Sequence, residues 1–389
     1  MKPELLAPCH DFATLSAAVE AGADAVYFGV KKYNMRLKAN NFNEKDLLRI
    51  TKLCHKNNVK AYLTVNVVVY EDELKSLKKL LIKAKRACVD AVIVHDLATL
   101  RLSYDLGLEC HVSTQANITN SESIKSYASM GASRVILSRE LTLKQLRTVI
   151  KQSPLPVEVF VHGAMCVSIS GRCFFSQAMY HKSANRGECN QPCRQEWVVK
   201  NNDGEFIYDG ESFLNSKDLC MIEHLPELIK AGPVSLKIEG RMKDANYVST
   251  VTKCYREAID DFSKKRVIDW KNRLSSVFNR GFCTGFYYNK LEENIKSSGN
   301  ASPIKKEFIG VVTNYYAKQG VAEIELKSGK LTLGEKIIIE SAESFHKQVV
   351  DSMEVNHNKI KVLKKGSKAG IKVSKRVSNG AQVYKIMLA

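Results

Sequence analysis

The sequence contains none of the short motifs that mark the common hydrolases and nucleotide-binding enzymes. It has no HExxH segment, which removes the usual zinc-protease arrangement, and neither a GxSxG elbow nor any other pattern that specifies a Ser-His-Asp triad. The dinucleotide fingerprint is also absent. Residues 329–336, GKLTLGEK, resemble a phosphate loop, but Glu335 stands where that loop requires a lysine. The sequence therefore supports neither these hydrolytic mechanisms nor P-loop nucleotide binding.

Long apolar runs are missing as well. No run approaches the roughly 18 residues that a membrane span needs, and the opening residues, MKPELLAPCHDF, do not form a signal peptide. Seven cysteines are scattered along the chain, mostly in apolar settings, namely Cys9, Cys54, Cys88, Cys110, Cys220, Cys254 and Cys283. This scatter fits a reducing compartment without disulfides. We therefore expect a cytoplasmic protein with no membrane partner.

Basic residues, by contrast, are in large excess. The 389-residue chain has 59 Lys and Arg against 41 Asp and Glu, a formal net charge of +18. A surplus of this size suggests a polyanionic partner, most often nucleic acid, although a lysine-rich background would produce part of it. The length allows one large core and a smaller domain.

Short β-rich runs alternate with amphipathic helical patterns over roughly the first 240 residues. The runs cover residues 4–8, 25–29, 61–66, 91–95, 110–114, 134–138, 157–162 and 234–240. Capping residues open several of the helical patterns and glycines close two of them, namely Asp11, Asn43, Asn120, Thr142, Gly22 and Gly131. Eight strands with interleaved helices indicate an α/β fold, a closed TIM-like (β/α)8 barrel, and leave an open doubly wound sheet as the alternative.

The barrel is expected to occupy residues 1–288, followed by a linker rich in Asn, Ser and Lys at 289–305. Residues 306–389 show short alternating runs between Gly, Asn and Ser turns, which predicts a small antiparallel β-barrel domain. The lysine-rich stretch 359–376 in this domain is either an RNA-backbone surface or a solvated face. No RNP-type aromatic motif accompanies it, so base recognition there is unsupported.

Four of the eleven cysteines, Cys166, Cys173, Cys189 and Cys193, fall within 28 consecutive residues. Their spacing, C-x6-C-x15-C-x3-C, matches neither a zinc ribbon nor the tight motif of radical enzymes. Soft thiolates favour iron-sulfur or zinc over hard cations, so we predict a four-sulfur 4Fe-4S site, with zinc or inert thiols as alternatives. The cysteine segment, residues 163–215, follows the seventh strand and should cap the mouth of the barrel, where active sites in this fold lie.

Strand alternation predicts a polar barrel interior. The inward set would be Glu4, Tyr62, Thr64, Asn66, His111, Ser113, Gln115, Glu158, His162, Lys237 and Glu239. Ionisable groups inside a barrel are costly unless they pair or serve a ligand. We therefore expect a polar ligand cavity, with a self-satisfied network, in which Lys237 neutralises Glu239 or Glu158, as the alternative.

Several segments together are similar to peptidase family U32, the collagenase-like peptidases. They are ELLAPCHDFATLSAAVEAGADAVYFG, NMRLKANNF, VEVFVHGAMCVSISGRCFFS, SANRGECNQPCR and SLKIEGRMKDANYV. The resemblance implies a 4Fe-4S protein that hydroxylates RNA or a quinone precursor without O2, with prephenate as a cosubstrate of the RNA-modifying members. It also implies that Cys166, Cys173, Cys189 and Cys193 ligate the cluster, with Cys220 as a weaker fifth candidate.

The length, the extra domain and the basic charge look most similar to the proteins that convert the wobble uridine of tRNA to 5-hydroxyuridine. Hydroxylation of a 23S rRNA cytidine, a peptidase, and a non-catalytic RNA-binding module with a structural cluster are the alternatives. The candidate catalytic residues are His162, Lys237, Glu239 and Arg241. His162 would move protons, and Glu239 with Arg241 would orient the base or a small anionic cosubstrate.

Overall fold

The computed structural model describes residues 2–169, 172–288, 292 and 299–388. The chain divides into two compact units, one comprising residues 1–10 and 18–301 and the other residues 11–17 and 302–389. The predicted linker at 289–305 lies largely outside the described residues, and the predicted domain limits stay a prediction. Among the described residues, no helix combines the length and the apolar character that crossing a membrane requires.

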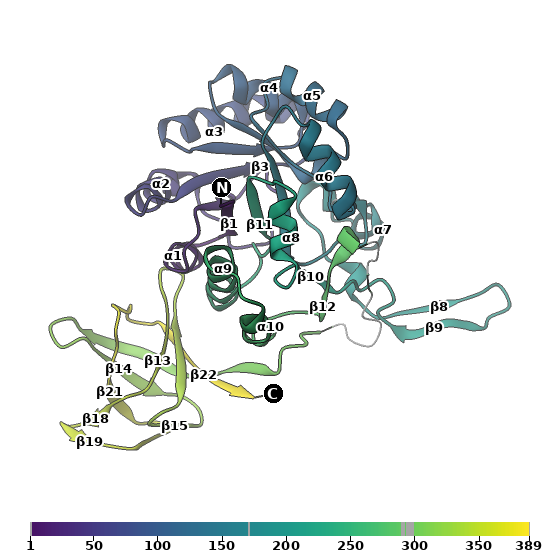
Figure 1. Cartoon of the computed structure of the whole chain (residues 1–389). Helices are drawn as coiled ribbons and strands as arrows, with labels where there is room; N and C mark the ends of the chain where they lie inside the picture. The colour runs from purple at the N-terminus through teal and green to yellow at the C-terminus, as the bar shows by residue number, and fades with distance from the viewer. Residues whose placement is uncertain (1, 170–171, 289–291, 293–298, 389) are drawn as a thin grey trace. The chain divides into compact units, whose positions relative to one another are not determined.

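Eight parallel strands form the closed barrel that the sequence predicts (Figure 1). Their bounds are β1 Glu4–Pro8, β2 Ala25–Phe28, β3 Lys60–Val65, β4 Ala91–Val94, β5 Cys110–Val112, β6 Arg134–Ile136, β7 Val157–Gly163 and β11 Ser235–Ile238. Ser235 of β11 is in register with Glu4 of β1 on one side and with Glu158 of β7 on the other. The ring therefore closes, and the open-sheet alternative is wrong.

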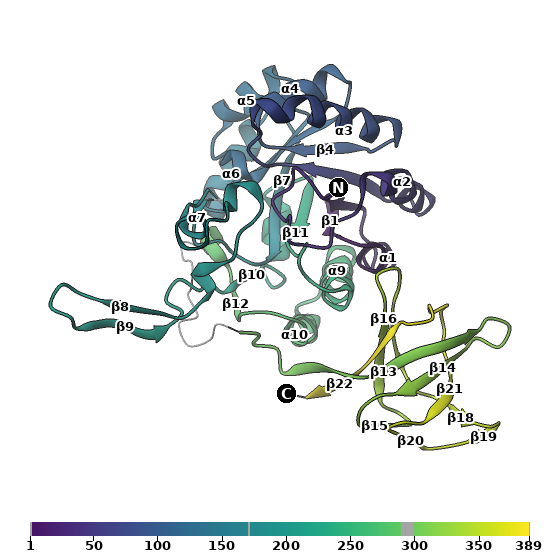
Figure 2. The same cartoon turned by 180° about the vertical axis from the view of Figure 1, so that it is seen from behind.

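Helices alternate with these strands, and α2 to α6 lie outside the barrel (Figures 1 and 2). The described helices are α1 Phe12–Glu20, α2 Leu47–Lys56, α3 Leu74–Arg86, α4 Leu97–Asp105, α5 Ser121–Ser129, α6 Leu143–Gln152, α7 Phe175–Tyr180, α8 Leu225–Lys230, α9 Ala245–Asp260 and α10 Val267–Ser275. The side chains of Asn120 and Thr142 accept from backbone N–H groups in the first turns of α5 and α6, which confirms two predicted caps. Gly131, with φ +96°, follows the end of α5.

Helix α3 shows why these patterns become helices on the barrel. Leu77, Leu80, Leu81 and Ala84, spaced by three, one and three residues, are all buried. Most of the lysines between them face solvent. Full burial of each leucine stabilises the fold by about 1.5–3 kcal/mol, which outweighs the modest preference of any single residue for a helix.

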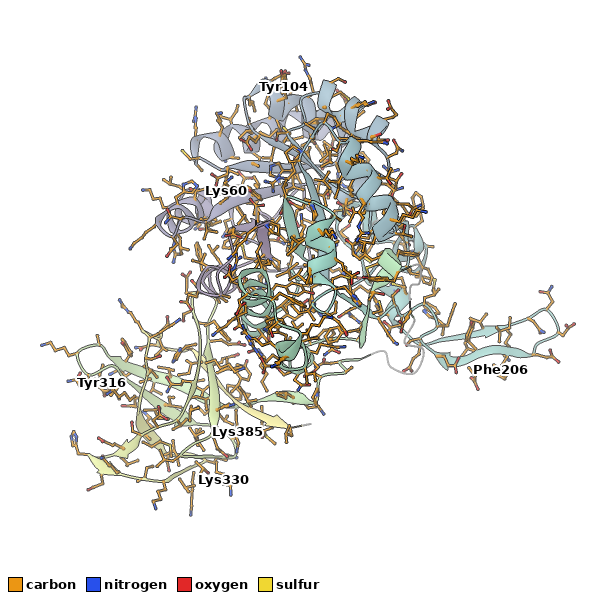
Figure 3. All side chains as sticks on the ribbon, viewed as in Figure 1. Lys60, Tyr104, Phe206, Tyr316, Lys330 and Lys385 are labelled. Carbon is orange, nitrogen blue, oxygen red and sulfur yellow. The ribbon has the colours of Figure 1, made fainter. Side chains whose placement is uncertain are left out.

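Four further strands in the barrel unit were not predicted. β10 (Asp218–Cys220) pairs antiparallel with the end of β7, and β12 (Phe282–Cys283) pairs with β10. β8 (Trp197–Lys200) and β9 (Phe206–Glu211) form a separate two-stranded hairpin within the cysteine segment. Figure 3 shows Phe206 on this hairpin, where its side chain is exposed.

The C-terminal residues form the antiparallel sheet that the sequence predicts. Its strand order is β17-β16-β22-β13-β14-β21-β18-β19, and β15 pairs separately with β20. The bounds are β13 Ile304–Tyr316, β14 Val321–Leu326, β15 Lys330–Thr332, β16 Lys336–Glu340, β17 Phe345–Val349, β18 Met353–Val355, β19 Asn358–Lys359, β20 Val362–Lys364, β21 Lys368–Lys372 and β22 Gln382–Leu388. Apolar residues including Ile324, Ile337 and Ile371 form its core. The lysines of 359–376 are exposed, which fits both predicted roles of that stretch.

Candidate active site at the barrel mouth

The cysteine segment begins where β7 ends. Gly163 closes that strand with φ +103°, and a Cβ there would lie 2.4 Å from the carbonyl oxygen of Glu239, so the position requires glycine. Beyond it, the four predicted cysteines, Cys166, Cys173, Cys189 and Cys193, all line one cavity of about 120 Å³. We call it the cysteine cavity. The structure thus brings together four side chains that span 28 residues of sequence.

The other walls of the cysteine cavity come from loops that follow barrel strands. Arg36 follows β2, Gln115 follows β5, Arg139 follows β6 and Met242 follows β11. These are the C-terminal ends of the strands, where active sites of this fold lie. The predicted position of the cysteine segment at the barrel mouth is therefore confirmed.

The cysteine cavity is strongly cationic. Its lining includes five basic side chains, Arg36, Lys38, Arg139, Arg194 and Arg280, and no Asp or Glu is among the described lining residues. Arg194 is tied to the segment itself, because its guanidinium donates to Asn215 Oδ1 at 2.6 Å and to the carbonyl oxygens of Ser216 and Met165. Such a lining favours anions, whether thiolates, carboxylates or phosphates.

Positive charge nearby is needed to stabilise the thiolate form of these buried cysteines. Burial raises the pKa of Cys193 to about 11, against the opposing effect of Arg194, and burial also raises the pKa of Cys189. Two backbone amides already point at sulfur: the N–H of Phe175 donates to Cys173 Sγ at 3.4 Å and that of Gln191 donates to Cys189 Sγ at 3.3 Å. Amide donors of this kind support thiolates that ligate a metal or a cluster.

Four thiols are the right donor set for a four-thiolate cofactor, but their side chains do not converge closely enough to bind a single metal ion. Within residues 2–169, 172–288, 292 and 299–388, no three His, Cys, Asp or Glu side chains are placed to hold a metal ion. Thiolates around a cluster lie farther apart than those around one ion, because several irons and sulfides stand between them. Ligation by the four cysteines, and the choice between 4Fe-4S, zinc and free thiols, stay predictions.

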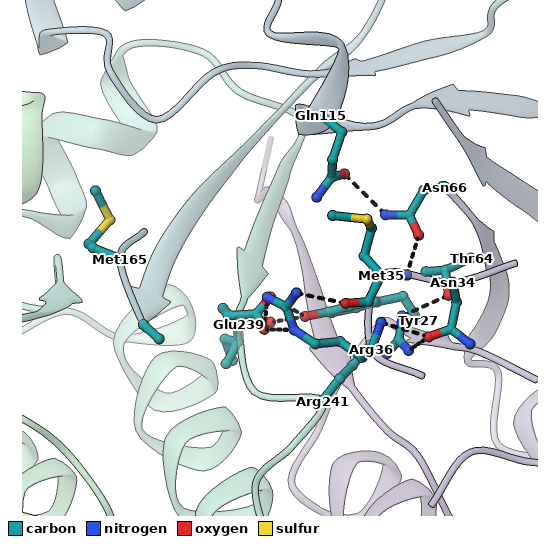
Figure 4. Close-up of polar contacts among 12 residues, drawn as sticks. Tyr27, Asn34, Met35, Arg36, Thr64, Asn66, Gln115, Met165, Glu239 and Arg241 are labelled. Carbon is teal, nitrogen blue, oxygen red and sulfur yellow. Dashed lines mark hydrogen bonds and ion pairs between the residues drawn. The ribbon is translucent and has the colours of Figure 1, made fainter. Parts of the chain in front are cut away.

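Glu239 follows β11 and is hydrogen-bonded to Arg36, which lines the cysteine cavity. The Arg36 guanidinium donates to Glu239 Oε1 from Nη2 at 3.0 Å and from Nε at 3.3 Å (Figure 4). Burial alone would raise the pKa of Glu239, but the positive charges of Arg36, Arg139 and Arg241 hold it below the ordinary value. Glu239 is therefore an ionised carboxylate that orients Arg36 at the cavity wall.

Arg241 lies next to this pair and is buried. It donates to Thr64 Oγ1 at 2.8 Å, to Asn41 Oδ1 at 3.2 Å and to Asn34 Oδ1. Burial lowers the pKa of Arg241 to about 10, and Arg36 acts in the same direction. Through Asn34 and Asn41, which precede and follow Arg36 in the loop after β2, it fixes the part of the loop that carries Arg36. Its contacts thus position the loop, while the predicted catalytic role stays untested.

Lys237 is part of a buried ion-pair network inside the barrel. Its Nζ lies 3.0 Å from Glu158 Oε1, and Glu158 Oε2 lies 3.3 Å from Arg134, which in turn contacts Glu4 at 2.6 Å. Glu158 is fully buried and Lys237 is 4% exposed. The self-satisfied alternative therefore describes this part of the interior, with Glu158 rather than Glu239 as the partner of Lys237.

His162 does not point into the barrel, so its predicted inward position is wrong. The register between β7 and β11 shifts, because Phe160 is opposite Lys237 while His162 is opposite Ile238. The extra residue is a β-bulge, and it turns His162 to the outer side that Ile238 also faces. There the ring packs against Tyr247, Tyr255 and Phe282.

This environment predicts a pH effect on stability. Burial, with a smaller contribution from Lys243, lowers the pKa of His162 to about 3, against roughly 6.5 in the unfolded chain. The unfolded state therefore binds the proton more readily than the folded state. The neutral His162 ring consequently contributes to the free energy of unfolding in full above pH 6.5. This contribution falls by about 1.4 kcal/mol per pH unit as the pH is lowered toward 3. Between pH 7 and pH 5 we expect the wild type to lose about 2 kcal/mol more than His162→Gln in urea unfolding. Equal losses would show that the imidazole is not held neutral.

Cys220, the fifth candidate ligand, is buried in β10 opposite His162. Its sulfur lies 4.0 Å from the hydroxyl oxygen of Tyr255, and burial raises its pKa to about 11. It is not among the residues that line the cysteine cavity. Its burial accounts for a cysteine at this position without a ligand role, in agreement with its place as the weaker candidate in the sequence analysis.

Sequence reasoning missed the basic lining, above all Arg36 and Arg139, whereas it had placed Gln115 in the polar interior of the barrel. Arg36 lies inside NMRLKANNF, one of the segments that carry the family resemblance, so a signal for it was present. Arg139 and Gln115 each lie three residues beyond the end of a barrel strand. Polar residues at that position of a (β/α)8 barrel are the natural candidates for a site.

Comparison with known proteins agrees with this architecture. The family model described as peptidase family U32 matches residues 10–297. A Methanocaldococcus jannaschii protein named as an uncharacterized protease is 45% identical, covering 98% of this chain and 97% of its own. A Porphyromonas gingivalis protein named collagenase is 35% identical, with the same coverage. The tRNA hydroxylation protein P1 of Bacillus subtilis is 34% identical over 81% of this chain and 78% of its own. This chain belongs to peptidase family U32.

Proposed function

We propose that this protein hydroxylates a tRNA wobble uridine to 5-hydroxyuridine without O2, using a 4Fe-4S cluster and prephenate. The observation that carries the proposal is the cysteine cavity, which four thiols and five basic side chains line at the barrel mouth. The relative named as a tRNA hydroxylation protein, and the chain's net charge of +18, support an RNA substrate.

The four cysteines would hold the cluster, and a bound cluster would supply electron transfer one electron at a time. Replacing C5–H of uracil by C5–OH with oxygen from water releases two protons and two electrons. A two-electron acceptor is then needed, and the 2-keto group of an anionic cosubstrate of the prephenate class would take up both electrons and both protons as it is reduced to an alcohol. Arg36 and Arg139 are the groups suited to bind its carboxylates, since an arginine fork matches a carboxylate in geometry and charge.

Glu239 and Arg241 have indirect roles in this scheme. Glu239 holds the Arg36 guanidinium by two hydrogen bonds, and Arg241 fixes the loop on which Arg36 lies. Because the partners of Arg36 are set before any ligand arrives, little reorganisation is needed when an anion binds. The surface of 359–376 supplies exposed lysines that suit an RNA backbone.

A peptidase is the second candidate, favoured by relatives named as a protease and as a collagenase. A peptidase needs an activated nucleophile or a metal-bound water. The cavity thiols have raised pKa values where a shift is resolved, at Cys189 and Cys193, and burial is the cause. Raised thiol pKa values oppose a cysteine nucleophile at neutral pH.

One experiment separates the candidates. Protein purified without air is incubated anaerobically with unmodified tRNA and prephenate, and the digested nucleosides are analysed by mass spectrometry. We expect a uridine that has gained one oxygen atom, no product when prephenate is omitted, and the visible absorption of an iron-sulfur cluster. The same preparation is offered 23S rRNA, collagen and casein. Modified cytidine in the rRNA, or cleaved protein with unchanged nucleosides, would overturn the proposal.

A further inference from the structure

A second pocket adjoins the cysteine cavity. It has a volume of about 280 Å³ and shares Met35 and Gln115 with that cavity. Its remaining walls are Val68, His95, Arg172, Phe174 and Asn185. Phe174 directly follows Cys173, and its side chain is 76% exposed. An exposed ring beside a polar pocket is a platform on which a flat ligand can stack.

The amide of Gln115 has a fixed orientation. The backbone N–H of Met35 donates to Asn66 Oδ1 at 3.3 Å, so Asn66 Nδ2 must be the donor to Gln115 Oε1, at 3.0 Å (Figure 4). Ser113 also donates to Gln115 Oε1. The other end of this side chain, Nε2, is consequently a donor, and it has no hydrogen-bond partner in the part of the chain that the structure describes.

Asn185 is oriented in the same way. The backbone N–H of Cys173 donates to Asn185 Oδ1 at 3.2 Å, so Asn185 Nδ2 is also a donor. His95 lines the same pocket. Burial, together with Arg172, lowers the pKa of His95, so its ring is neutral at pH 7 and has one nitrogen that accepts a hydrogen bond. The pocket therefore offers two amide donors and one acceptor.

We propose that this pocket, the base pocket, binds a uracil base that stacks on Phe174, with Gln115 and Asn185 donating to its two carbonyl oxygens. Uracil presents acceptor, donor and acceptor along this edge, which complements the groups of the pocket. Cytosine replaces one carbonyl by an amino donor, which would face a second donor, and such a mismatch is a strong basis for discrimination. Arg172, whose Nε donates to the backbone carbonyl oxygen of Gln115 at 3.1 Å, adds positive charge that would attract the adjoining phosphate.

This inference rests on the proposed function, because the base pocket would place the uracil ring beside the cysteine cavity. It adds a residue-level reason why uridine rather than cytidine is the substrate. Gln115 is the link, since it lines both cavities.

Binding alone tests the base pocket. Two fluorescein-labelled RNA stem-loops, identical except for U or C at one loop position, are titrated by fluorescence anisotropy at one fixed salt concentration. We expect the wild type to bind the U form about 10-fold more tightly. Phe174→Ala should weaken both complexes by roughly 5- to 100-fold through lost stacking. Gln115→Glu keeps the acceptor at Oε1 but loses the donor, so the preference for U should disappear.

Phe206→Ala is the matched control, because Phe206 is also an exposed phenylalanine, 56% accessible, but lies on the β8–β9 hairpin (Figure 3). It should bind as the wild type does. Unchanged binding by Phe174→Ala, or an unchanged preference for U in Gln115→Glu, overturns the base pocket. If that happens while tRNA is still hydroxylated, the proposed function stands alone. If the preference is found and lost as expected without any hydroxylation, the base pocket stands and the proposed function fails.

Discussion

Under the proposed function, Cys189→Ser is expected to lower tRNA hydroxylation by about 100-fold or more and to remove the visible absorption that a bound cluster would give. Mutation of a residue that only hydrogen-bonds to a metal ligand typically lowers metal affinity or activity by about 10- to 100-fold. Loss of a ligand itself should therefore have an effect at or above the top of that range. Cys189 lines the cysteine cavity and already accepts a hydrogen bond from the Gln191 amide. Iron and acid-labile sulfide per chain, together with the yield of oxidised uridine, measure both effects.

Cys88→Ser is the control for this experiment. Cys88 is an exposed free cysteine that does not line the cavity, so its loss should change neither iron content nor product yield. Zinc in place of iron in the wild-type protein, purified without air, would favour the zinc alternative. Full iron content in Cys189→Ser would remove that residue from the ligand set.

The barrel was predictable because its signals are local. Each strand is a short β-rich run, and capping groups such as Asn120 and Thr142 act within three residues of their own position. The position of the cysteine segment followed from strand order alone, since any excursion after β7 of a closed barrel emerges at its C-terminal end. Those inferences require no knowledge of which side chains meet.

The orientation of His162 was not predictable in that way. Strict alternation places it with Glu158 and Phe160, but the bulge in β7 inserts one residue, and a shift of one residue turns every later side chain to the opposite face. The bulge depends on pairing with β11, more than 70 residues away. The short strands β10 and β12, which extend the sheet from the end of β7, have too few residues to leave a pattern in the sequence.

The ion pairs show the same limit. A sequence places Lys237 and Glu239 on one face of a strand, yet each finds a partner from another part of the chain. Lys237 pairs with Glu158 of β7, and Glu239 pairs with Arg36 of the loop after β2. Both contacts join residues separated by more than 70 positions. Alternation therefore predicts which residues share the polar interior and offers candidate partners, Glu158 and Glu239 for Lys237, but it does not decide between them.

Glu158→Gln is expected to destabilise the protein by about 3–5 kcal/mol, because it removes one partner of a buried ion pair and leaves a charge without compensation. Arg134 would retain Glu4, so the uncompensated charge is that of Lys237, whose Nζ lies over the rings of Tyr27 and Phe160. Urea unfolding at pH 7 measures the loss. Glu122→Gln is the control: it breaks the exposed pair with Lys125 and should leave stability unchanged within error.

The double variant Glu158→Gln/Lys237→Met separates charge from packing. Replacing both members of a buried pair by neutral groups of similar size is often close to neutral, so most of the lost stability should return. If the double variant is as unstable as Glu158→Gln, the loss comes from disrupted packing and the network does not hold Lys237. If the double variant recovers stability, the Glu158–Lys237 pair serves the folded structure. Hydroxylation of tRNA by the double variant would then show that Lys237 is not needed for catalysis. That second readout decides whether the barrel interior beneath the cysteine cavity belongs to the fold or to the reaction.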